Sequence, residues 1–275
     1  MDAVHLPAGS LSLLSPPLIS MAFSPEERDR YARHLDLPGF GEQAQEKLRT
    51  GRVLVIGCGG LGSPALYYLA AAGIGHLGLV DSDIVDLSNL QRQILHTTPD
   101  IGRLKVDSAV ARLRVLNPHV QLEAHSCRLT EDNARDLFAP YDMILDATDN
   151  FETKYLISDT CVAMQKPFIH AGISAFCGQL MTVLPGESAC LRCVFPEPPA
   201  MSRADDATAA GPLGAIPGVI GSLQATEAIK FLTGLGTLLT DTLLTFDGLE
   251  AEFRPIHANR NAACPACGNG ATPKE

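Results

Sequence analysis

The sequence contains no long uninterrupted apolar segment and has only a modest share of charged residues. No run of about 18 apolar residues lacks a charge or a helix breaker, which argues against a transmembrane helix. With 275 residues that are 46% hydrophobic and only 19% charged, the chain can bury a substantial core as one large domain and is not expected to be extensively disordered. The net charge of −10 disfavours nucleic acid or an anionic membrane as the main partner.

The N-terminal segment lacks the basic residue that a secretory signal requires. Residues 1–22 are mildly apolar, but no Lys or Arg precedes Arg28, and Pro16-Pro17 interrupts the apolar run. We expect residues 1–22 to be a disordered extension, with Met21 as the initiating methionine. A docking segment is the alternative.

The cysteines do not have the arrangement of a secreted disulfide scaffold. Four of the eight form two Cys-x-x-Cys pairs, and four are scattered among apolar neighbours: Cys58, Cys127, Cys161 and Cys177. Disulfide scaffolds are usually short, cysteine-dense and preceded by a signal. We therefore expect this protein in a reducing cytoplasm.

Strand-like and helix-like segments alternate through the first half of the chain. Ser24, Pro25 and Glu27 form the capping pattern of a short helix, and a second helix is expected over 41–50. Further strands are expected over 52–56, 76–80, 120–125 and 143–146, and helices over 61–72, 105–116 and 131–138. This alternation predicts an α/β fold with a Rossmann-like, mostly parallel sheet and right-handed crossovers.

The pattern changes after about residue 166. Strands are expected over 167–171, 178–184, 242–247 and 251–256, with a loop over 196–217 and a helix over 219–232. We expect a single domain over 23–275 in which two halves share one sheet. The nucleotide-binding half covers about 51–166, and the mixed β/α half covers about 167–275.

A glycine-rich loop, Gly57-Cys-Gly59-Gly60-Leu-Gly62, directly follows the first strand of the expected sheet and opens a helix. Glycines permit a tight turn and let backbone N–H groups approach a phosphate at the helix N-terminus. Asp81 ends the next strand, where a carboxylate usually binds ribose hydroxyls. This strand–turn–helix pattern predicts nucleotide binding but does not distinguish NAD from ATP.

Three polar features follow neighbouring strands and can converge beyond their carboxyl ends. Asp83 and Ser88-Asn89-Leu90-Gln91-Arg92-Gln93 follow the second strand, Lys105 begins the next helix, and Thr148-Asp149-Asn150 follows a later strand. Each is weak alone, because Arg92 or Lys105 could be a solvated surface charge and Asp149 could cap the following helix. Together they place two cations and a carboxylate beside a phosphate loop.

This set suits attack of a substrate carboxylate on the α-phosphate of ATP. The attack brings like charges together, each pair costing about 4 kcal/mol at ~4 Å with an effective dielectric of ~20. Arg92 and Lys105 can neutralise the triphosphate and the departing pyrophosphate, while Asp149 can hold Mg²⁺. Hydride transfer needs none of these groups.

Several separated stretches occur in a definite order: GCGGLG, VDSDIVDLSNLQRQ, a lysine 13 residues past Arg92, DATDN, AGISAFCGQ and GVIGSLQATEAIK. Together, over roughly residues 24–270, they resemble the MoeB/ThiF/HesA family of ubiquitin-activating-enzyme-like proteins, and most closely its molybdopterin-synthase adenylyltransferase type. The resemblance implies ATP-dependent adenylation of the C-terminal Gly carboxylate of a small ubiquitin-like, MoaD-like sulfur carrier. Pyrophosphate would be released, and the pathway would be molybdenum cofactor biosynthesis.

The resemblance also implies roles for individual residues. Asp81 would bind the ribose, Asn89, Arg92 and Lys105 the phosphate chain, and Asp149 would be the Mg²⁺-binding and catalytic carboxylate. Arg33 corresponds to an arginine that the neighbouring subunit of a homodimer donates. The full set expected around the nucleotide is Gly57, Gly59, Gly60, Gly62, Asp81, Ser88, Asn89, Leu90, Gln91, Arg92, Lys105, Asp149 and Asn150.

Two cysteine pairs, Cys190-Leu-Arg-Cys193 and Cys264-Pro-Ala-Cys267, have the spacing of a tetrahedral four-thiolate zinc site. We expect a strand-end turn to hold each pair. Residues 258–275 have little apolar area to bury, so Zn²⁺ would staple this tail to the first pair in a structural role. A redox pair or unrelated thiols are the alternatives.

A cysteine that some relatives carry is missing. Relatives that form a thioester or persulfide keep a cysteine before the GVIG-type helix, whereas residues 203–214 contain none and Ala207 occupies its position. We also expect no rhodanese-like domain after Cys267. We expect the reaction to end at the acyl-adenylate, with sulfur delivered by a separate protein. Cys177 and His170 are expected to be core residues.

Three other functions are alternatives to this adenylation. A ThiF-type enzyme would adenylate a ThiS-like carrier for thiamine synthesis, which the loop without cysteine disfavours but does not exclude. An NAD-dependent oxidoreductase would have no use for Lys105 with Asp149. A non-catalytic scaffold would not need the intact set of charged residues. The sequence alone does not name the carrier, which we expect to end in Gly-Gly.

Overall fold

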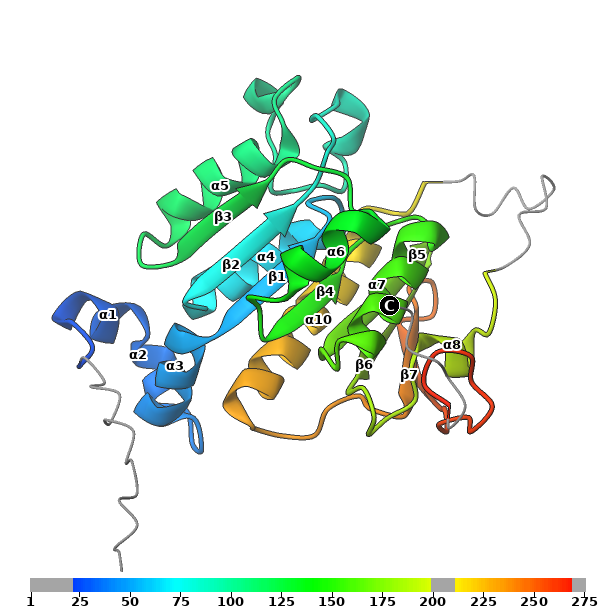
Figure 1. Ribbon diagram of the computed structural model, residues 1–275. Helices are drawn as coiled ribbons and strands as arrows, with labels where there is room; N and C mark the ends of the chain where they lie inside the picture. The colour runs from blue at the N-terminus through cyan, green and yellow to red at the C-terminus, as the bar shows by residue number, and fades with distance from the viewer. Residues whose placement is uncertain (1–21, 199–210, 269–275) are drawn as a thin grey trace, which may run out of the picture.

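The computed structural model describes residues 22–198 and 211–268, which are built around one eight-stranded sheet of order β3-β2-β1-β4-β5-β6-β7-β8 (Figure 1). The parallel strands are β1 (Arg52–Ile56), β2 (His76–Val80), β3 (Gln121–His125), β4 (Met143–Asp146) and β5 (Phe168–Ser174). Strands β6 (Cys177–Val183), β7 (Thr242–Asp247) and β8 (Glu252–His257) join in antiparallel pairs. The predicted mostly parallel sheet with a mixed second half is confirmed. Residues 1–21 of the expected extension, Met21 included, lie outside the described residues.

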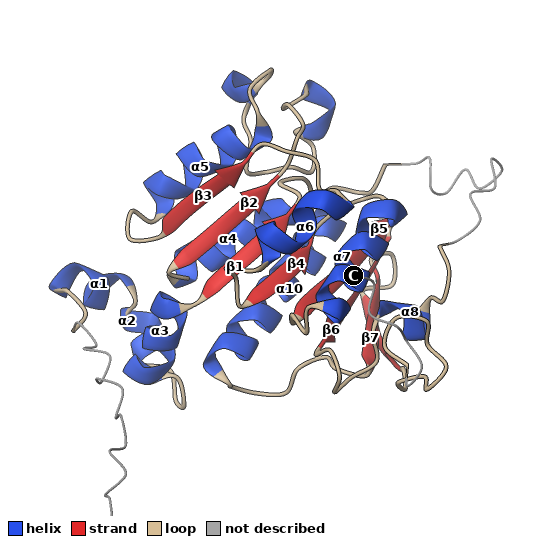
Figure 2. Cartoon of the chain, in the orientation of Figure 1, coloured by secondary structure: helices blue, strands red, loops and turns tan. Residues whose placement is uncertain are grey.

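Helices cover both faces of the sheet (Figure 2). Those on one face are α4 (Gly62–Ala72), α5 (Lys105–Leu116) and α10 (Ala215–Thr233), and those on the other are α6 (Glu131–Phe138) and α7 (Phe151–Ala163). The shorter helices are α1 (Pro25–Arg30), α2 (Ala32–Leu35), α3 (Gly41–Thr50) and α8 (Leu191–Val194), with 3₁₀ turns at Leu87–Asn89 and Thr98–Asp100.

Strand β1 shows why its segment reads as a continuous apolar run. Val53 and Val55 pack in the core under α4 and α10, whereas Leu54 and Ile56 pack in the core under α6 and α7. Successive side chains of a strand point to opposite faces, and both faces of this sheet are covered, so all four side chains are buried.

Helix α10 begins earlier than expected. Residues 215–217 were predicted as the end of a loop, but they form the first turn of this helix. Pro217 is tolerated there because the first N–H groups of a helix have no partner within it. Strand β5 also extends beyond the expected end at residue 171, because it continues in a hairpin with β6 as far as Ser174.

The N-terminal helices are attached at the amino ends of the strands. The predicted capping box at Ser24 is confirmed, with Glu27 as its partner. Asn117, which is fully buried just before β3, donates to the Tyr31 hydroxyl at 2.9 Å and to the Ala70 carbonyl at 2.7 Å. These bonds tie the α1–α2 junction to the ends of α4 and α5.

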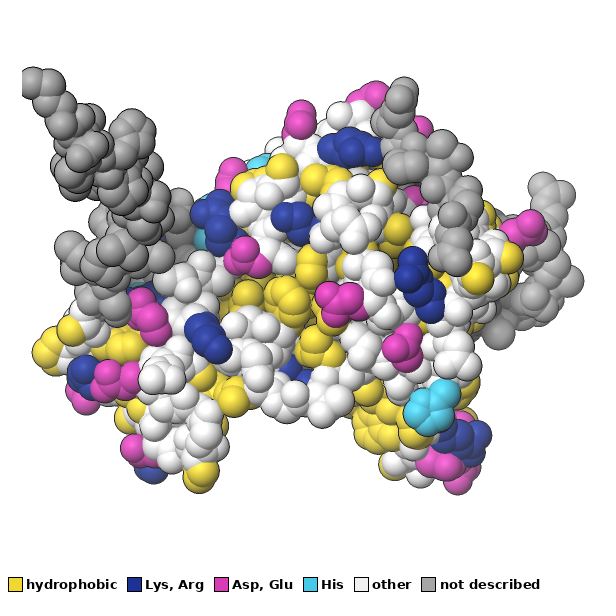
Figure 3. Space-filling view, turned by 60° about the horizontal axis from the view of Figure 1, so that its bottom comes forward, with side chains coloured by type: hydrophobic (Ala, Val, Ile, Leu, Met, Phe, Trp, Pro, Cys, Tyr) yellow, Lys and Arg dark blue, Asp and Glu magenta, His cyan; other side chains and the backbone are white. Residues whose placement is uncertain are grey.

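The described surface shows no extended field of one charge on the face drawn in Figure 3, where Lys and Arg side chains are interspersed with Asp and Glu. Within residues 22–198 and 211–268, no helix is long and apolar enough to cross a membrane.

Replacing Asn117 by Ala should lower the free energy of unfolding by about 1–3 kcal/mol, because it leaves the buried Tyr31 hydroxyl without its partner and removes one of the two donors to the Ala70 carbonyl. Val115→Ala, at an exposed position two residues away, should change it by less than about 0.5 kcal/mol. Urea unfolding of both variants gives the comparison. Equal stabilities would show that Asn117 does not anchor the N-terminal helices.

Candidate functional site

The strand order reverses at β1, which has β2 on one side and β4 on the other. In an open α/β sheet, ligands bind beyond the carboxyl ends of the strands at such a reversal. Three segments meet there: the glycine loop after β1, residues 81–93 after β2 and residues 147–150 after β4. Contacts of the glycine loop with Asp81 and with Ala147 confirm that these segments converge at this edge of the sheet.

Two positions of the glycine loop admit no other residue. Gly57 has a φ of +102°, and a Cβ there would lie 2.6 Å from the Ala147 carbonyl oxygen. A Cβ on Gly62 would lie 1.9 Å from the Gly57 carbonyl oxygen. The loop therefore packs against the segment after β4, and α4 starts directly on it.

The Asp81 side chain holds the glycine loop by a hydrogen bond to its backbone. Its Oδ2 accepts a hydrogen bond from the Cys58 N–H at 2.8 Å, and its Oδ1 accepts one from the Asp83 N–H at 2.9 Å. The carboxylate thus already has two backbone donors. Its contact with a ribose stays a prediction.

A second support of this loop was missed by the sequence reasoning. His96 donates from Nε2 to the Cys58 carbonyl at 2.9 Å, and its Nδ1 lies 2.9 Å from the Ser108 hydroxyl. Burial lowers the pKa of His96, which keeps the ring neutral. No local sequence pattern marks this histidine, because its partners are 38 and 12 residues away along the chain.

The two expected phosphate-binding cations stand in different environments. The Arg92 guanidinium donates to the Ser88 carbonyl at 3.1 Å, and its stem passes beside Gly60. Lys105 has a buried side chain, 8% exposed, whose Nζ pairs with Asp83 Oδ2 at 2.8 Å. Lys105 is therefore not a solvated surface charge. Binding of phosphate by either cation stays a prediction.

The segment after β4 leaves Asp149 unengaged. Asn150 is the N-cap of α7 and accepts from the Thr153 N–H at 2.9 Å, so the alternative that Asp149 caps this helix is wrong. Asp149 is exposed, and its carboxylate has no hydrogen bond or ion pair with any residue in 22–198 or 211–268. It can accept a metal ion, whereas the Asn150 side chain is already in use.

Arg33 lies far from this crevice in its own subunit. It is exposed on α2, which precedes the α3 helix that leads into the amino end of β1. The glycine loop is at the opposite, carboxyl ends of the strands (Figure 1). Arg33 therefore does not complete the site of its own chain.

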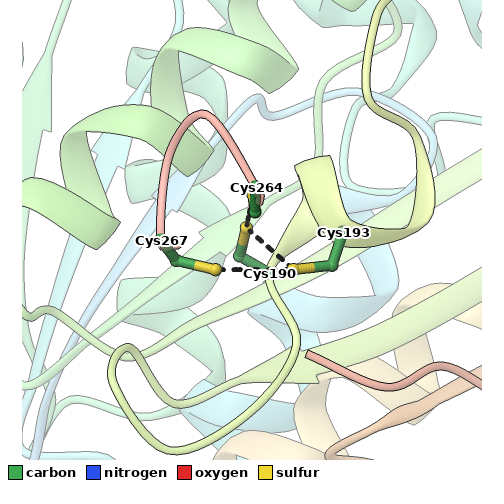
Figure 4. Close-up of side chains that lie close together, drawn as sticks. All are labelled: Cys190, Cys193, Cys264 and Cys267. Atoms are coloured by element: carbon green, nitrogen blue, oxygen red, sulfur yellow. Dashed lines mark hydrogen bonds between the residues drawn. The ribbon is translucent and has the colours of Figure 1, made fainter. Parts of the chain in front are cut away.

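The four cysteines of the two pairs come together, as predicted (Figure 4). Sγ–Sγ distances are 3.8 Å for Cys190–Cys193, 3.6 Å for Cys190–Cys264 and 3.4 Å for Cys193–Cys267. A tetrahedron with Zn–S bonds of about 2.3 Å has edges of about 3.8 Å, so the donor set fits Zn²⁺. Zinc itself stays a prediction.

One detail of the metal centre differs from expectation. The first pair does not lie on a strand-end turn, because Cys190 is the N-cap of α8 and Cys193 lies within this helix. The Arg260 guanidinium adds a second clamp on the tail by donating to the carbonyls of Gly186 and Cys267. The tail is thus held at both a cysteine cluster and an arginine.

A cavity of about 550 Å³ extends from Asp149 toward β6 and β7. His170 lies in its wall and is buried, as expected. Cys177 is not a core residue, and this prediction is wrong. It is exposed in the same cavity wall, because it begins β6 at the hairpin rather than continuing the apolar run behind it.

Comparison with known proteins identifies the family. The ThiF family profile matches residues 31–266. The chain belongs to the ThiF family. This ThiF-family chain is 45% identical over 260 residues to the sulfur carrier protein adenylyltransferase of Thermus thermophilus, covering 93% of this chain and 96% of that protein. It is 41% identical to the SAMP-activating enzyme E1 of Haloferax volcanii, covering 92% and 93% of the two chains.

Solved structures show the same fold as this ThiF-family chain. MccB of E. coli, in a crystal structure with MccA-N7isoASN, superimposes with a TM-score of 0.79 at 23% identity, covering 88% of this chain and 75% of MccB. PaaA gives a TM-score of 0.74 at 24% identity, covering 90% of this chain and 79% of that one. At these identities the likeness establishes the fold alone.

Purified protein should contain about one zinc per chain, and Cys267→Ser should lower both the zinc content and the melting temperature, because metal binding at such sites contributes folding free energy. Cys177→Ser, which removes an exposed cysteine outside the cluster, is the matched control and should change neither. Elemental analysis and thermal unfolding measure both quantities. A metal-free protein whose stability is insensitive to Cys267→Ser would contradict the zinc assignment.

Proposed function

We propose that this chain is an ATP-dependent adenylyltransferase that activates the C-terminal carboxylate of a small sulfur carrier protein and releases pyrophosphate. Its activity as an adenylyltransferase accords with the names of relatives that it matches over nearly their full length. The observation that carries the proposal is the unengaged Asp149, which lines a cavity and belongs to the segment that packs against the glycine loop. The NAD-dependent alternative gives these charges no role.

The proposed roles follow from the geometry. The N–H groups of the glycine loop and the N-terminus of α4 would bind phosphates. Arg92 and Lys105 would neutralise charge that develops as pyrophosphate departs, since both are held in place before substrate arrives. Asp149 would hold Mg²⁺, which supplies further neutralisation of the triphosphate when bound.

The carrier's C-terminus would enter the cavity of about 550 Å³, because Asp149 lines this space. Its C-terminal carboxylate is the nucleophile, so the enzyme need not supply one. We propose that the reaction ends at the acyl-adenylate and that a separate protein donates sulfur. The sequence of residues 203–214 supports this, since it contains no cysteine, although Ala207 lies outside the described residues.

We assign a MoaD-like carrier and molybdenum cofactor biosynthesis as the pathway, on the motifs of the sequence. A ThiS-like carrier of thiamine synthesis is the second candidate. Pyrophosphate exchange measured with each purified carrier distinguishes the two by the ratio of kcat/KM.

We also propose that the enzyme is a homodimer in which Arg33 acts on the neighbouring crevice. Arg33 lies at the opposite end of the strands from its own glycine loop. In a two-fold dimer the same surface of each subunit faces the other, so each α2 can reach the partner's site.

Asp149→Ala should reduce carrier-dependent exchange of pyrophosphate into ATP by about 10²-fold or more, because it removes the proposed Mg²⁺ ligand. Glu152→Ala removes an exposed carboxylate three residues away and should retain full exchange. Cys177→Ser should also retain it, because adenylation requires no thiol. Full exchange in Asp149→Ala, or exchange by the wild type without carrier, would overturn the mechanism.

Arg33→Ala and Asp149→Ala should each be nearly inactive, yet a mixture of the two should regain activity after dissociation and reassembly. Half of the dimers would then be heterodimers with one intact site of two, which restores about a quarter of the wild-type rate. Arg28→Ala, an exposed neighbour on α1, should be active alone. If heterodimers form and remain inactive, Arg33 does not act across the dimer.

A further inference from the structure

A buried polar network lies in the wall of the cavity and has no part in the mechanism so far. Asp146, the last residue of β4, is 1% exposed, and its carboxylate pairs with Lys154 Nζ at 3.1 Å and with His170 Nδ1 at 2.9 Å. Lys154 and Asp146 compensate each other's charge. The third member, His170, also faces the cavity.

The carboxylate determines which ring nitrogen of His170 carries the hydrogen. Burial by itself would raise the pKa of Asp146. The charge of Lys154 and the hydrogen bond from His170 outweigh burial and lower this pKa to about 2. Asp146 is thus an acceptor only, and His170 Nδ1 must donate to it. Burial lowers the pKa of His170, so the ring is neutral. Its Nε2 therefore carries a lone pair.

Among residues 22–198 and 211–268, this lone pair receives one long hydrogen bond. The donor is Gln179 Nε2 at 3.4 Å, longer than the usual range of about 2.7–3.2 Å, so a better-placed N–H can compete for the lone pair. Gln179 lies over Gly172, where a Cβ would come within 3.2 Å of its amide nitrogen. Both His170 and Gln179 line the cavity, whose other walls include Phe151, Ile173 and Phe246.

We propose that His170 is a specificity-determining residue that accepts a hydrogen bond at Nε2 from a backbone N–H of the carrier's last two residues. This inference rests on the proposed function. A neutral imidazole acceptor disfavours a carboxylate and favours an amide N–H, so it recognises the peptide just before the carboxylate that reacts. The Gln179 amide, which can both donate and accept, lies beside His170 and could bind the same peptide backbone.

The test uses a synthetic octapeptide ending in Gly-Gly, and two versions of it that are N-methylated at one or the other glycine. Binding is measured by calorimetry without ATP. His170→Asn places an amide donor near the Nδ1 position, which keeps the bond to Asp146, but it removes the acceptor at Nε2. His170→Gln places an amide oxygen near Nε2 instead.

The wild type should bind the unmodified peptide about tenfold more tightly than His170→Asn, which corresponds to the loss of one hydrogen bond. One N-methylated peptide should lose a similar factor with the wild type and little with His170→Asn, and His170→Gln should regain part of the affinity. His76→Gln, which alters another buried histidine that pairs with a carboxylate, should bind like the wild type.

Additive effects of N-methylation and His170→Asn, or no binding of the peptide to the wild type, would overturn this assignment. Nucleotide binding and the melting temperature of His170→Asn, measured alongside, should stay at wild-type values, and a parallel loss of both would show a purely structural role. Pyrophosphate exchange with a whole carrier tests the proposed function separately. If pyrophosphate exchange with the carrier persists but the effects of N-methylation and His170→Asn on peptide binding are additive, only the proposed role of His170 is refuted.

Discussion

The carboxylate of Asp146 is the constraint on which the crevice depends. It accepts from the N–H and hydroxyl of Thr148, which turns the segment carrying Asp149 toward the glycine loop. The same group holds Lys154 of α7, and the Asp146 carbonyl accepts from Gln224 of α10 at 2.9 Å. A buried charge is costly unless it is paired, so removal of this carboxylate would leave the buried Lys154 ammonium uncompensated and the hydrogen bonds of Thr148 and His170 unmade.

Both halves of the chain build the nucleotide crevice. Helix α10, from the second half, packs against α4 so closely that a Cβ on Gly221 would lie 2.3 Å from the Leu61 carbonyl oxygen. Pro217, in its first turn, lies beside Gly60 of the glycine loop. The glycine loop is therefore held by Asp81, at the end of β2, and by Pro217, in the first turn of α10.

The sequence predicts the strands well because their apolar runs are bounded by glycine, proline or charge, and it predicts the convergence of the cysteine pairs from spacing. It could not predict what depends on distant partners. Whether Asp149 or Asn150 caps α7 depends on the extended backbone at Asn150, and the exposure of Cys177 depends on where the β5–β6 hairpin turns. The Asp146–His170 pair joins adjacent strands whose register no local pattern reveals.

The burial of Lys105 has a consequence for the ionic environment in which the protein can work. Mobile ions screen exposed charges over about 8 Å at physiological ionic strength, but they reach buried charges poorly. The ammonium group of Lys105 is enclosed by protein and neutralised by Asp83, which is 66% exposed, so a polyphosphate would exchange with a protein carboxylate rather than with dissolved anions. In a chain with a net charge of −10, this arrangement would keep the proposed substrate-binding cation available even in concentrated salt.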